Sequence, residues 1–229
     1  MKKNLIIIGA SGDLGKGAGD VLIRKGYDKY FFLDRKFEDK TDTANNIQYI
    51  RTDDMTNEEN VINAFKKIEQ NKTELYFLFS TIGGFYGGKS LEETPFENWL
   101  KMQNINLNTA FLIAKHFAIF VKETAGGSIC FTGAVSGNKH EKNKIAYGAS
   151  KKGLHYLTKS LVLESKTSGF SVNTIAPLII DTPANREWVE NKDMMVSPGD
   201  IGEFIHALFL NYKIVNGNVI ELPGTLNNR

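Results

Sequence analysis

A tyrosine and a lysine four residues apart, in the segment YGASK at 147–151, are the side chains best suited to proton transfer. On a helix, residues four apart lie on one face, so we expect Tyr147 and Lys151 to be neighbours. A free phenol titrates near pH 10, and an ammonium group within about 4–6 Å lowers that pKa by favouring the phenolate. The pair could therefore exchange a proton near neutral pH, although the same spacing also occurs in ordinary amphipathic helices.

A glycine-rich segment early in the chain predicts a phosphate-binding turn. Three glycines occur at every third position of GASGDLG, 9–15, directly after the apolar run 5–8. A glycine turn between a strand and a helix lets the backbone approach a pyrophosphate, whose charge the helix N-terminus stabilises. Glycines that only form a tight turn are the alternative. The residues that we expect at a dinucleotide here are Gly9, Ser11, Gly12, Asp13, Leu14 and Gly15.

An aspartate at the expected distance supports a dinucleotide. Asp34 lies 19 residues after Gly15, close to the spacing of about 20 at which an acidic side chain receives the adenosine ribose hydroxyls. A carboxylate accepts hydrogen bonds from both hydroxyls and repels a 2′-phosphate, so NAD(H) is favoured. Arg35 could pair with such a phosphate, which leaves NADP(H) open.

The turn DDMTN at 53–57 follows the third apolar run and could place Asp54 and Met55 against an adenine. Asp54 could instead cap the following helix, since Thr56 and Glu59 also have the spacing of a capping box. Both interpretations stay open.

The elements that must position these residues alternate along the chain. Apolar runs predict strands at 5–8, 30–33, 47–50, 75–79, 128–131, 171–175 and 218–222. Helical periodicity predicts helices at 14–25, 57–70, 96–121, 147–166 and 198–211. Uninterrupted apolar strands between helices indicate an α/β fold with a single doubly wound parallel sheet of about seven strands and helices on both faces, a Rossmann-like architecture. No linker divides the chain, so we expect one domain over 1–229.

Composition restricts the function classes. Hydrophobic residues make up 41% and charged residues 24% of the chain. The net charge is +2 and the Lys and Arg residues are dispersed, so we expect no nucleic-acid partner, which would need basic residues clustered on one face. No run approaches the roughly 20 apolar residues of a membrane span, and the single Cys130 is compatible with a reducing cytoplasm. The four histidines have no metal-ligand spacing, so no metal is expected. We interpret the basic segment NKHEKNK at 138–144 as a solvated loop.

The order of these motifs resembles the short-chain dehydrogenase/reductase family over nearly the whole chain. The segments that carry the resemblance are GASGDLG at 9–15, Asp34, STIGG at 80–84, NIN at 104–106, YGASK at 147–151 and NTIAPLIIDT at 173–182. The resemblance implies an NAD(P)-dependent oxidoreductase that moves hydride between the nicotinamide and a small organic substrate. It also implies a homodimer or homotetramer built on the two long helices, which the composition leads us to expect in the cytoplasm and without a membrane partner.

The resemblance assigns roles to individual residues. Tyr147 matches the general acid or base, Lys151 the group that tunes it and binds the nicotinamide ribose, and Asn106 the asparagine that organises a water relay. Ile180, through its backbone, and Thr182 match positions that hold the nicotinamide carboxamide. An amide that kinks or caps a helix is the alternative for Asn106, and a cap for the segment beginning at 183 is the alternative for Thr182. The further cofactor positions that the family implies are Ile82, Gly83 and Pro177.

One departure from the family pattern restricts the class of substrate. Many family members carry a serine thirteen positions before the tyrosine, where its hydroxyl binds the substrate carbonyl, but this position is Ala134. Ser136 could replace it from a shifted loop.

The alanine, GGFYGGKS at 83–90 and PLIIDTPANR at 177–186 resemble the dihydropteridine reductase branch, which reduces quinonoid dihydropterins with NADH. Phe85 matches an aromatic residue there that could stack on a flat substrate, or it could simply anchor its loop, whereas Asn106 is not expected in that branch. A ketone or secondary alcohol is the alternative substrate. A catalytically weak dinucleotide-binding sensor or scaffold is the alternative function.

Overall fold

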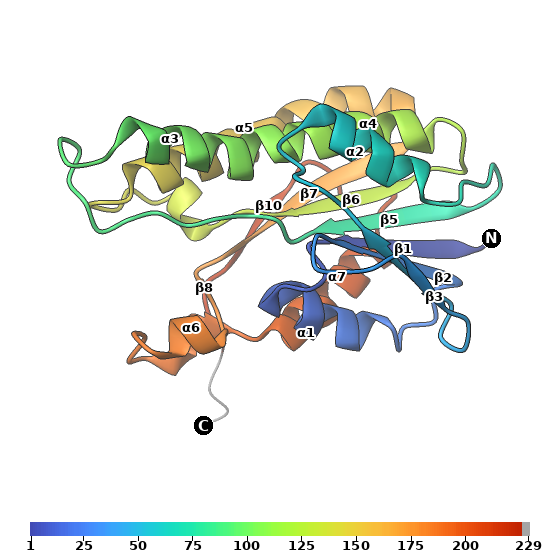
Figure 1. The fold of residues 1–229 in the computed structure, drawn as a ribbon, viewed down its shortest axis with the longest axis horizontal. Coiled ribbons are helices and arrows are strands. Elements are labelled where there is room, and N and C mark those ends of the chain that lie inside the picture. Colours follow the sequence, from blue (N-terminus) through green and yellow to red (C-terminus); the bar gives the residue numbers. More distant parts are fainter. Residues whose placement is uncertain (226–229) are drawn as a thin grey trace.

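The centre of the molecule is one eight-stranded sheet, seen in a computed structural model that describes residues 1–225 (Figure 1). The strand order is β10-β7-β6-β5-β1-β2-β4-β3, and only β3 runs antiparallel to its neighbour. The strands are β1 (Lys3–Ile8), β2 (Lys29–Asp34), β3 (Lys40–Asp42), β4 (Ile47–Arg51), β5 (Leu75–Ser80), β6 (Gly127–Thr132), β7 (Phe170–Pro177) and β10 (Val219–Leu222). The predicted doubly wound parallel sheet is confirmed. The sequence pattern missed β3, because its residues KTD include no apolar side chain.

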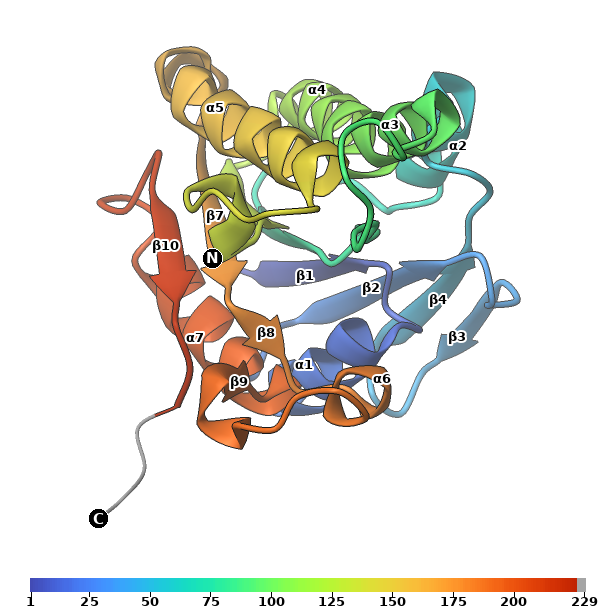
Figure 2. The same cartoon turned by 90° about the vertical axis from the view of Figure 1, so that its left-hand side faces the viewer.

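Helices cover both faces of the sheet, as Figures 1 and 2 show. One face carries α2 (Glu58–Lys66), α3 (Phe96–Gln103), α4 (Thr109–Val121) and α5 (Ile145–Ser168), and the other carries α1 (Asp13–Leu22) and α7 (Pro198–Leu210). The alternation of side chains along β1 explains the two layers. Ile6 and Ile8 lie in the core beneath α2, α4 and α5, while Leu5 and Ile7 lie in the core beneath α1 and α7. A strand buried on both faces needs apolar residues at every position, which is what the uninterrupted runs indicated.

A π-helical turn interrupts the helix predicted over 96–121. The turn spans Asn104–Asn108, between α3 and α4. Such turns inside α-helices often mark functional sites. Here the turn carries Asn106, so the element that the sequence pattern predicted as continuous is divided at a candidate site residue.

A small excursion follows β7. It contains the paired strands β8 (Ile179–Ile180) and β9 (Met195–Val196), the short helix α6 (Pro183–Arg186) and a 3₁₀ turn at Lys192–Met194. A second 3₁₀ turn, Val135–Gly137, follows β6. Within residues 1–225, no helix combines the length and the low polarity that crossing a bilayer requires.

Candidate active site

The carboxyl ends of the central strands meet at one edge of the sheet. Ile8 at the end of β1 pairs with Leu33 of β2 and with Ser80 of β5, and Thr132 of β6 pairs with Ile175 of β7. Because all five strands are parallel, the loops that follow them lie at this same edge. The chain order also reverses between β1 and β5, where α/β sheets bind ligands.

The turn after β1 is shaped by its glycines. Gly9 has a φ of +86°, in the left-handed region that favours glycine. A Cβ added at Gly15 would lie 2.3 Å from the Gly9 carbonyl oxygen, so only glycine lets α1 start this close to the strand. The N-cap of α1 is Gly12, and no side chain caps the helix. The N–H groups of its first turn therefore remain available to an anion.

The other residues predicted in this turn divide by exposure. Ser11 and Leu14 are buried, whereas Gly12 and Asp13 are exposed. Thr81, at the start of the loop after β5, donates its hydroxyl to the carbonyl of Gly9 at 2.9 Å. This contact joins the glycine turn to the neighbouring loop, and the sequence reasoning had not assigned it.

Asp34 ends β2 beside the glycine turn. Its carboxylate accepts hydrogen bonds from the backbone N–H groups of Ser11, at 3.1 Å, and Lys36, at 3.0 Å. Partial burial acts to raise the pKa of this carboxyl, but the hydrogen bonds from Ser11 and Lys36 outweigh it and hold the pKa below its usual value. Asp34 is therefore ionised at neutral pH, while its neighbour Arg35 is exposed.

In the turn after β4, the capping interpretation is wrong, while the placement of Asp54 and Met55 against an adenine stays a prediction. The N-cap of α2 is Asn57, whose side chain accepts from the N–H of Glu59 at 2.9 Å. Asp54 instead accepts from the N–H of Thr56 at 3.0 Å, before the helix begins. The N-terminus of α2 is therefore capped neither by Asp54 nor by a Thr56–Glu59 capping box. The short Asn57 side chain reaches the helix N–H group directly, because α2 begins one residue later than the pattern predicted. Met55 is only 5% exposed and packs in the core beneath α2.

Lys151 is the most deeply placed charge of the site. It is 3% exposed, and its ammonium donates to the carbonyl oxygen of Thr132 at 2.8 Å. The ammonium lies 5.8 Å from the ring centroid of Tyr147, as the four-residue spacing on α5 predicted. Burial lowers the pKa of Lys151 to about 8. A Cβ added at Gly83 would lie 3.0 Å from this ammonium, so the loop after β5 passes directly over the lysine.

The pKa of the Tyr147 phenol differs from the lowered value that the sequence predicted. Burial raises its pKa well above the ordinary value, and the negative charge of Glu141 raises it further. The prediction that Lys151 leaves the phenol with a lowered pKa is therefore wrong for the protein chain by itself, because desolvation and the charge of Glu141 both raise this pKa. Tyr147 is protonated throughout the neutral range.

Asn106 fixes the loop that follows β5. Its side-chain oxygen accepts from the N–H of Gly84 at 2.9 Å, and its amide nitrogen donates to the Gly84 carbonyl and to the Ser150 hydroxyl, both at 3.0 Å. A Cβ added at Gly83 would lie 3.1 Å from the side-chain oxygen. Gly83 and Lys151 are thus brought together with Asn106, and Ile82 packs against the core beside them.

An aromatic ring and a second loop close the site near Tyr147. Phe85 is 64% exposed, and its ring centroid lies 5.0 Å from that of Tyr147 with an interplanar angle of 72°. The two loops are joined where the N–H of Gly88 donates to the carbonyl of Asn143 at 2.9 Å. Phe85 is placed by this junction and by the Asn106–Gly84 hydrogen bonds.

The position of the missing serine is apolar. Ala134 is 5% exposed, and the Ser136 hydroxyl donates to the carboxylate of Glu141. Glu141 also accepts from the ammonium of Lys144 at 2.5 Å. Sequence reasoning missed Glu141, although an acidic residue in a basic loop shortly before Tyr147 was a signal.

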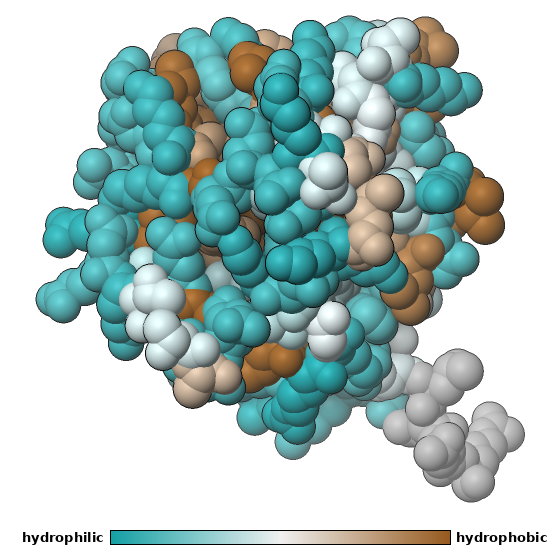
Figure 3. Space-filling view, turned by 90° about the vertical axis from the view of Figure 1, so that its right-hand side faces the viewer, coloured by the Kyte–Doolittle hydropathy of each residue, from teal (hydrophilic) through white to brown (hydrophobic). Residues whose placement is uncertain are grey.

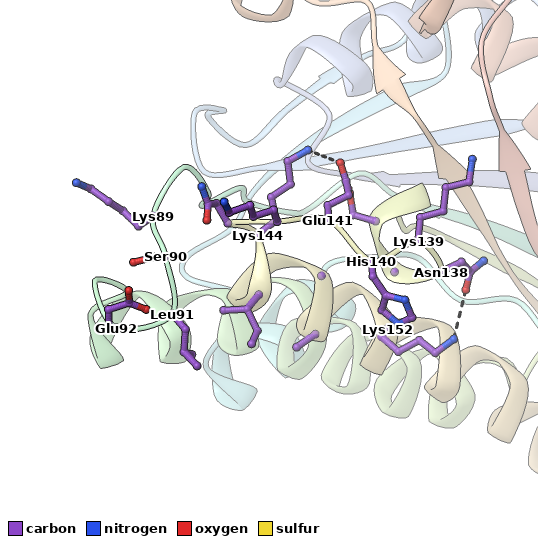
Figure 4. Close-up of a pocket in the computed structure, with 17 residues that line it drawn as sticks. Lys89, Ser90, Leu91, Glu92, Asn138, Lys139, His140, Glu141, Lys144 and Lys152 are labelled. Atoms are coloured by element: carbon purple, nitrogen blue, oxygen red, sulfur yellow. Dashed lines mark hydrogen bonds and ion pairs between the residues drawn. The ribbon is translucent and has the colours of Figure 1, made fainter.

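The predicted solvated loop lines a groove of about 790 Å³ (Figure 4). Most of its side chains are exposed, as predicted, and Lys144 turns toward Glu141 in the figure. The groove also borders α5 at Gly148, next to Tyr147, and the loop at Ser136.

The remaining predicted residues follow β7. Pro177 ends that strand, and Ile180 ends β8, where its carbonyl accepts from the side chain of Asn185 at 2.9 Å. The Thr182 hydroxyl oxygen accepts from the N–H of Asn185 at 3.3 Å and caps α6, so the capping interpretation of Thr182 is confirmed. Because the cap uses the oxygen, the hydroxyl proton stays available to a further acceptor.

Comparisons with known proteins agree with this arrangement. The sequence model of the short chain dehydrogenase family matches residues 3–193. A 3-oxoacyl-[acyl-carrier-protein] reductase from Homo sapiens is 26% identical over 235 residues, covering 99% of this chain and 98% of the relative. A dihydropteridine reductase from Dictyostelium discoideum is 26% identical over 193 residues, covering 83% of this chain and 80% of the relative. The solved structure of ElxO with NADP bound is 24% identical and superposes with a TM-score of 0.82, over 96% of this chain and 97% of ElxO.

Proposed function

Because the chain belongs to the short chain dehydrogenase family and is an NAD(P)-dependent oxidoreductase, we propose that Tyr147 exchanges the proton that accompanies hydride transfer to or from a small organic substrate. The observation that carries this proposal is the convergence of three residues at the loop after β5. Tyr147 and Lys151 share one face of α5, and Asn106 binds Gly84 of the loop and Ser150 of α5. When bound, the dinucleotide supplies or takes the hydride.

The glycine turn suits the pyrophosphate of that dinucleotide. The left-handed Gly9, the close contact at Gly15 and the uncapped N-terminus of α1 provide a backbone surface with free N–H groups. Asp34 would accept the ribose hydroxyls, and Thr182 and the backbone of Ile180 would hold the carboxamide. An ionised Asp34 repels a 2′-phosphate, so we favour NAD(H) over NADP(H).

The raised pKa of Tyr147 suits the reductive direction. A phenol that keeps its proton at neutral pH is ready to deliver it to the substrate as hydride arrives. Lys151, oriented by the Thr132 carbonyl, would stabilise the phenolate that results and bind the nicotinamide ribose. Asn106 would hold the loop that covers the lysine.

A flat quinonoid compound of the dihydropterin type is the substrate class that we favour. Phe85 offers an exposed ring beside Tyr147, and Ala134 provides no hydroxyl for a carbonyl oxygen. The likeness to the Dictyostelium enzyme named dihydropteridine reductase supports the same choice. A ketone or secondary alcohol is the alternative, supported by the human 3-oxoacyl-[acyl-carrier-protein] reductase.

Replacing Tyr147 by Phe tests the mechanism. Removing the general acid is expected to lower kcat by about 100-fold or more, while NADH binding, followed by fluorescence titration, stays within a factor of two, on the order of 0.4 kcal/mol. Turnover should be measured with a quinonoid dihydropterin, a quinone, an imine and a ketone. Undiminished turnover by the Phe variant would contradict the role of Tyr147.

The alternative of a sensor or scaffold protein makes the opposite prediction for the unaltered chain. It is motivated by Ala134, and the assembled Tyr147, Lys151 and Asn106 argue against it. Tight NADH binding with no turnover of any substrate in that panel would favour it.

A further inference from the structure

The substrate atom that receives the proton differs in lone pairs between substrate classes. A carbonyl oxygen has two lone pairs and gains negative charge as hydride reaches the carbon, so two hydrogen-bond donors serve it best. The nitrogen of a C=N bond has one lone pair and is served by one donor. The number of side-chain donors around Tyr147 therefore bears on the class of bond that is reduced.

The donors around Tyr147 are nearly all engaged. The amide nitrogen of Asn106 donates to the Gly84 carbonyl and the Ser150 hydroxyl, and Ser150 donates to the Tyr147 carbonyl. Position 134 is an alanine. Within residues 1–225, the hydroxyl of Tyr147 has no hydrogen-bond partner, so it is free to face a substrate.

Ser136 carries the other hydroxyl that could reach the substrate, but this hydroxyl already donates its hydrogen bond to Glu141. An ionised carboxylate only accepts hydrogen bonds, so the single hydroxyl proton of Ser136 must point at Glu141. Ser136 then offers a substrate only lone pairs. Thr182 and Lys151 are assigned to the cofactor. We propose that, within residues 1–225, the Ser136–Glu141 hydrogen bond leaves Tyr147 as the one hydroxyl that donates to the substrate, and that this selects substrates reduced at a C=N bond over carbonyl compounds. This inference rests on the proposed function, since it takes Tyr147 as the proton donor.

The negative charge of Glu141 also disfavours carbonyl substrates relative to C=N substrates. It opposes negative charge on the phenol, and it would equally oppose the charge that develops on a carbonyl oxygen. A C=N nitrogen is basic enough to take the Tyr147 proton before hydride arrives, and the cation that results loses its positive charge as it is reduced. Lys144 offsets part of this field, because its ammonium contacts Glu141 and lies 6.0 Å from the Phe85 ring centroid.

NADH and Tyr147 together supply the hydride and the proton that reduction of a C=N bond requires. Hydride from NADH forms a C–H bond at the carbon, the π electron pair moves to nitrogen, and the Tyr147 proton forms the N–H bond. The C=N compound is reduced to an amine, NADH is oxidised to NAD⁺, and the phenolate regains a proton from solvent beside Lys151. No second donor is required at any step.

A double-mutant cycle with a matched pair of probes tests the inference. The probes are 2-methyl-1-pyrroline and 2-methylcyclopentanone, a cyclic imine and a ketone of similar shape, with a quinonoid dihydropterin as reference. Wild type should prefer the imine. Glu141→Ala frees the Ser136 hydroxyl, so kcat/KM for the ketone relative to the imine should rise about 10-fold or more, the lower range for one oxyanion donor. Glu141→Ala combined with Ser136→Ala should lose that gain.

Two controls separate the hydroxyl from other effects. Glu92 is an acidic residue that lines the same groove, and Glu92→Ala should leave the ratio unchanged. If the double variant keeps the gain, the unpaired Lys144 is responsible and the inference is overturned. An equal preference of wild type for both probes would overturn it as well.

A readout without turnover is the pKa of Tyr147, measured by ultraviolet difference titration against Tyr147→Phe. Glu141→Ala should lower that pKa, because a negative charge is removed, and an unchanged pKa would contradict the proximity of the two groups. Turnover of the dihydropterin that depends on Tyr147, with no change of ratio in Glu141→Ala, defeats this inference alone. Absence of turnover with all three substrates defeats the proposed function itself.

Discussion

At the scale of single residues, burial governs the site more than pairing does. Lys151 is driven by desolvation toward a pKa of about 8, and the phenol of Tyr147 is driven in the opposite direction, away from the phenolate. Both shifts favour the uncharged form, as expected of groups removed from water. The positive charge of an oxidised nicotinamide would oppose this effect at the phenol and favour release of the Tyr147 proton.

Asp34 carries the prediction on cofactor choice. Asp34→Asn keeps an oxygen for the Ser11 N–H group but removes the charge that repels a 2′-phosphate and strengthens the ribose hydrogen bonds. Since hydrogen bonds to charged groups contribute about 1.5–3 kcal/mol, the ratio of kcat/KM for NADH to that for NADPH should fall about 10- to 100-fold. Steady-state kinetics with both cofactors measures it. Arg35→Ala is the matched control, and it should weaken only NADPH use; a wild type that prefers NADPH would refute the assignment.

At the scale of elements, two breaks in regular structure build the site. The π-helical turn between α3 and α4 carries Asn106, whose amide holds both backbone groups of Gly84. The glycine turn between β1 and α1 lets the helix begin against the strand end. Each break costs regular hydrogen bonds, and in each case the backbone is turned toward the edge of the sheet where the cofactor would lie.

Substitutions at the two glycines at the start of α1 distinguish an effect on packing from an effect on cofactor binding. An alanine at Gly15 would place its Cβ 2.3 Å from the Gly9 carbonyl oxygen and 2.7 Å from the Cα of Ala10. Overpacking of this kind costs about 1–3 kcal/mol, so Gly15→Ala should lower the melting temperature by roughly 3–8 °C. At Gly12 the nearest atom is 3.5 Å away, an ordinary contact.

Gly12→Ala should therefore melt within about 2 °C of wild type, a change of under 1 kcal/mol. Its added methyl group would face the pyrophosphate, so its affinity for NADH should fall. Thermal denaturation and NADH fluorescence titration distinguish the two effects. Equal NADH affinity in wild type and Gly12→Ala would show that the dinucleotide does not lie against this turn.

At the scale of the whole molecule, exposed apolar side chains gather on the outer faces of α4 and α5. Phe111 and Ile119 on α4 are 51% and 54% exposed, and Tyr156 and Leu163 on α5 are 74% and 77% exposed. Spacings of seven and eight residues place each pair on one helix face. The face shown in Figure 3 is by contrast mostly hydrophilic, with apolar residues in small separate groups. We propose that α4 and α5 form the contact of a homodimer or homotetramer.

Placing a charge on this surface tests the assembly. Leu163→Lys puts a hydrated ammonium into the proposed contact, so the mass measured by size-exclusion chromatography with light scattering should shift toward the monomer. Ile214, 82% exposed beyond the end of α7, offers the control, and Ile214→Lys should leave the mass unchanged. A wild type that is monomeric at micromolar concentration would contradict the proposal.

The sequence by itself determined the features that depend on neighbours along the chain. Uninterrupted apolar runs between helical segments predicted a doubly wound parallel sheet, and its confirmation follows from the need of a strand covered on both faces to be apolar throughout. Local segments such as GASGDLG and YGASK sufficed for the family and for its dependence on a nicotinamide cofactor. Strand β3 and the Asn57 cap escaped prediction, because short polar segments offer several partners of similar quality.

Only the tertiary structure decided which groups of the candidate site contact one another. The contacts of Lys151 with the Thr132 carbonyl and of Asn106 with Gly84 join segments far apart in the chain, and a backbone carbonyl leaves no mark in a sequence. The direction of the Tyr147 pKa required its burial, which depends on how α5 packs on the sheet. The hydrogen bond between Ser136 and Glu141 likewise exists only because the loop folds back over five residues beside α5. Proton energetics are set by such through-space contacts, whereas the fold follows from periodicity along the chain.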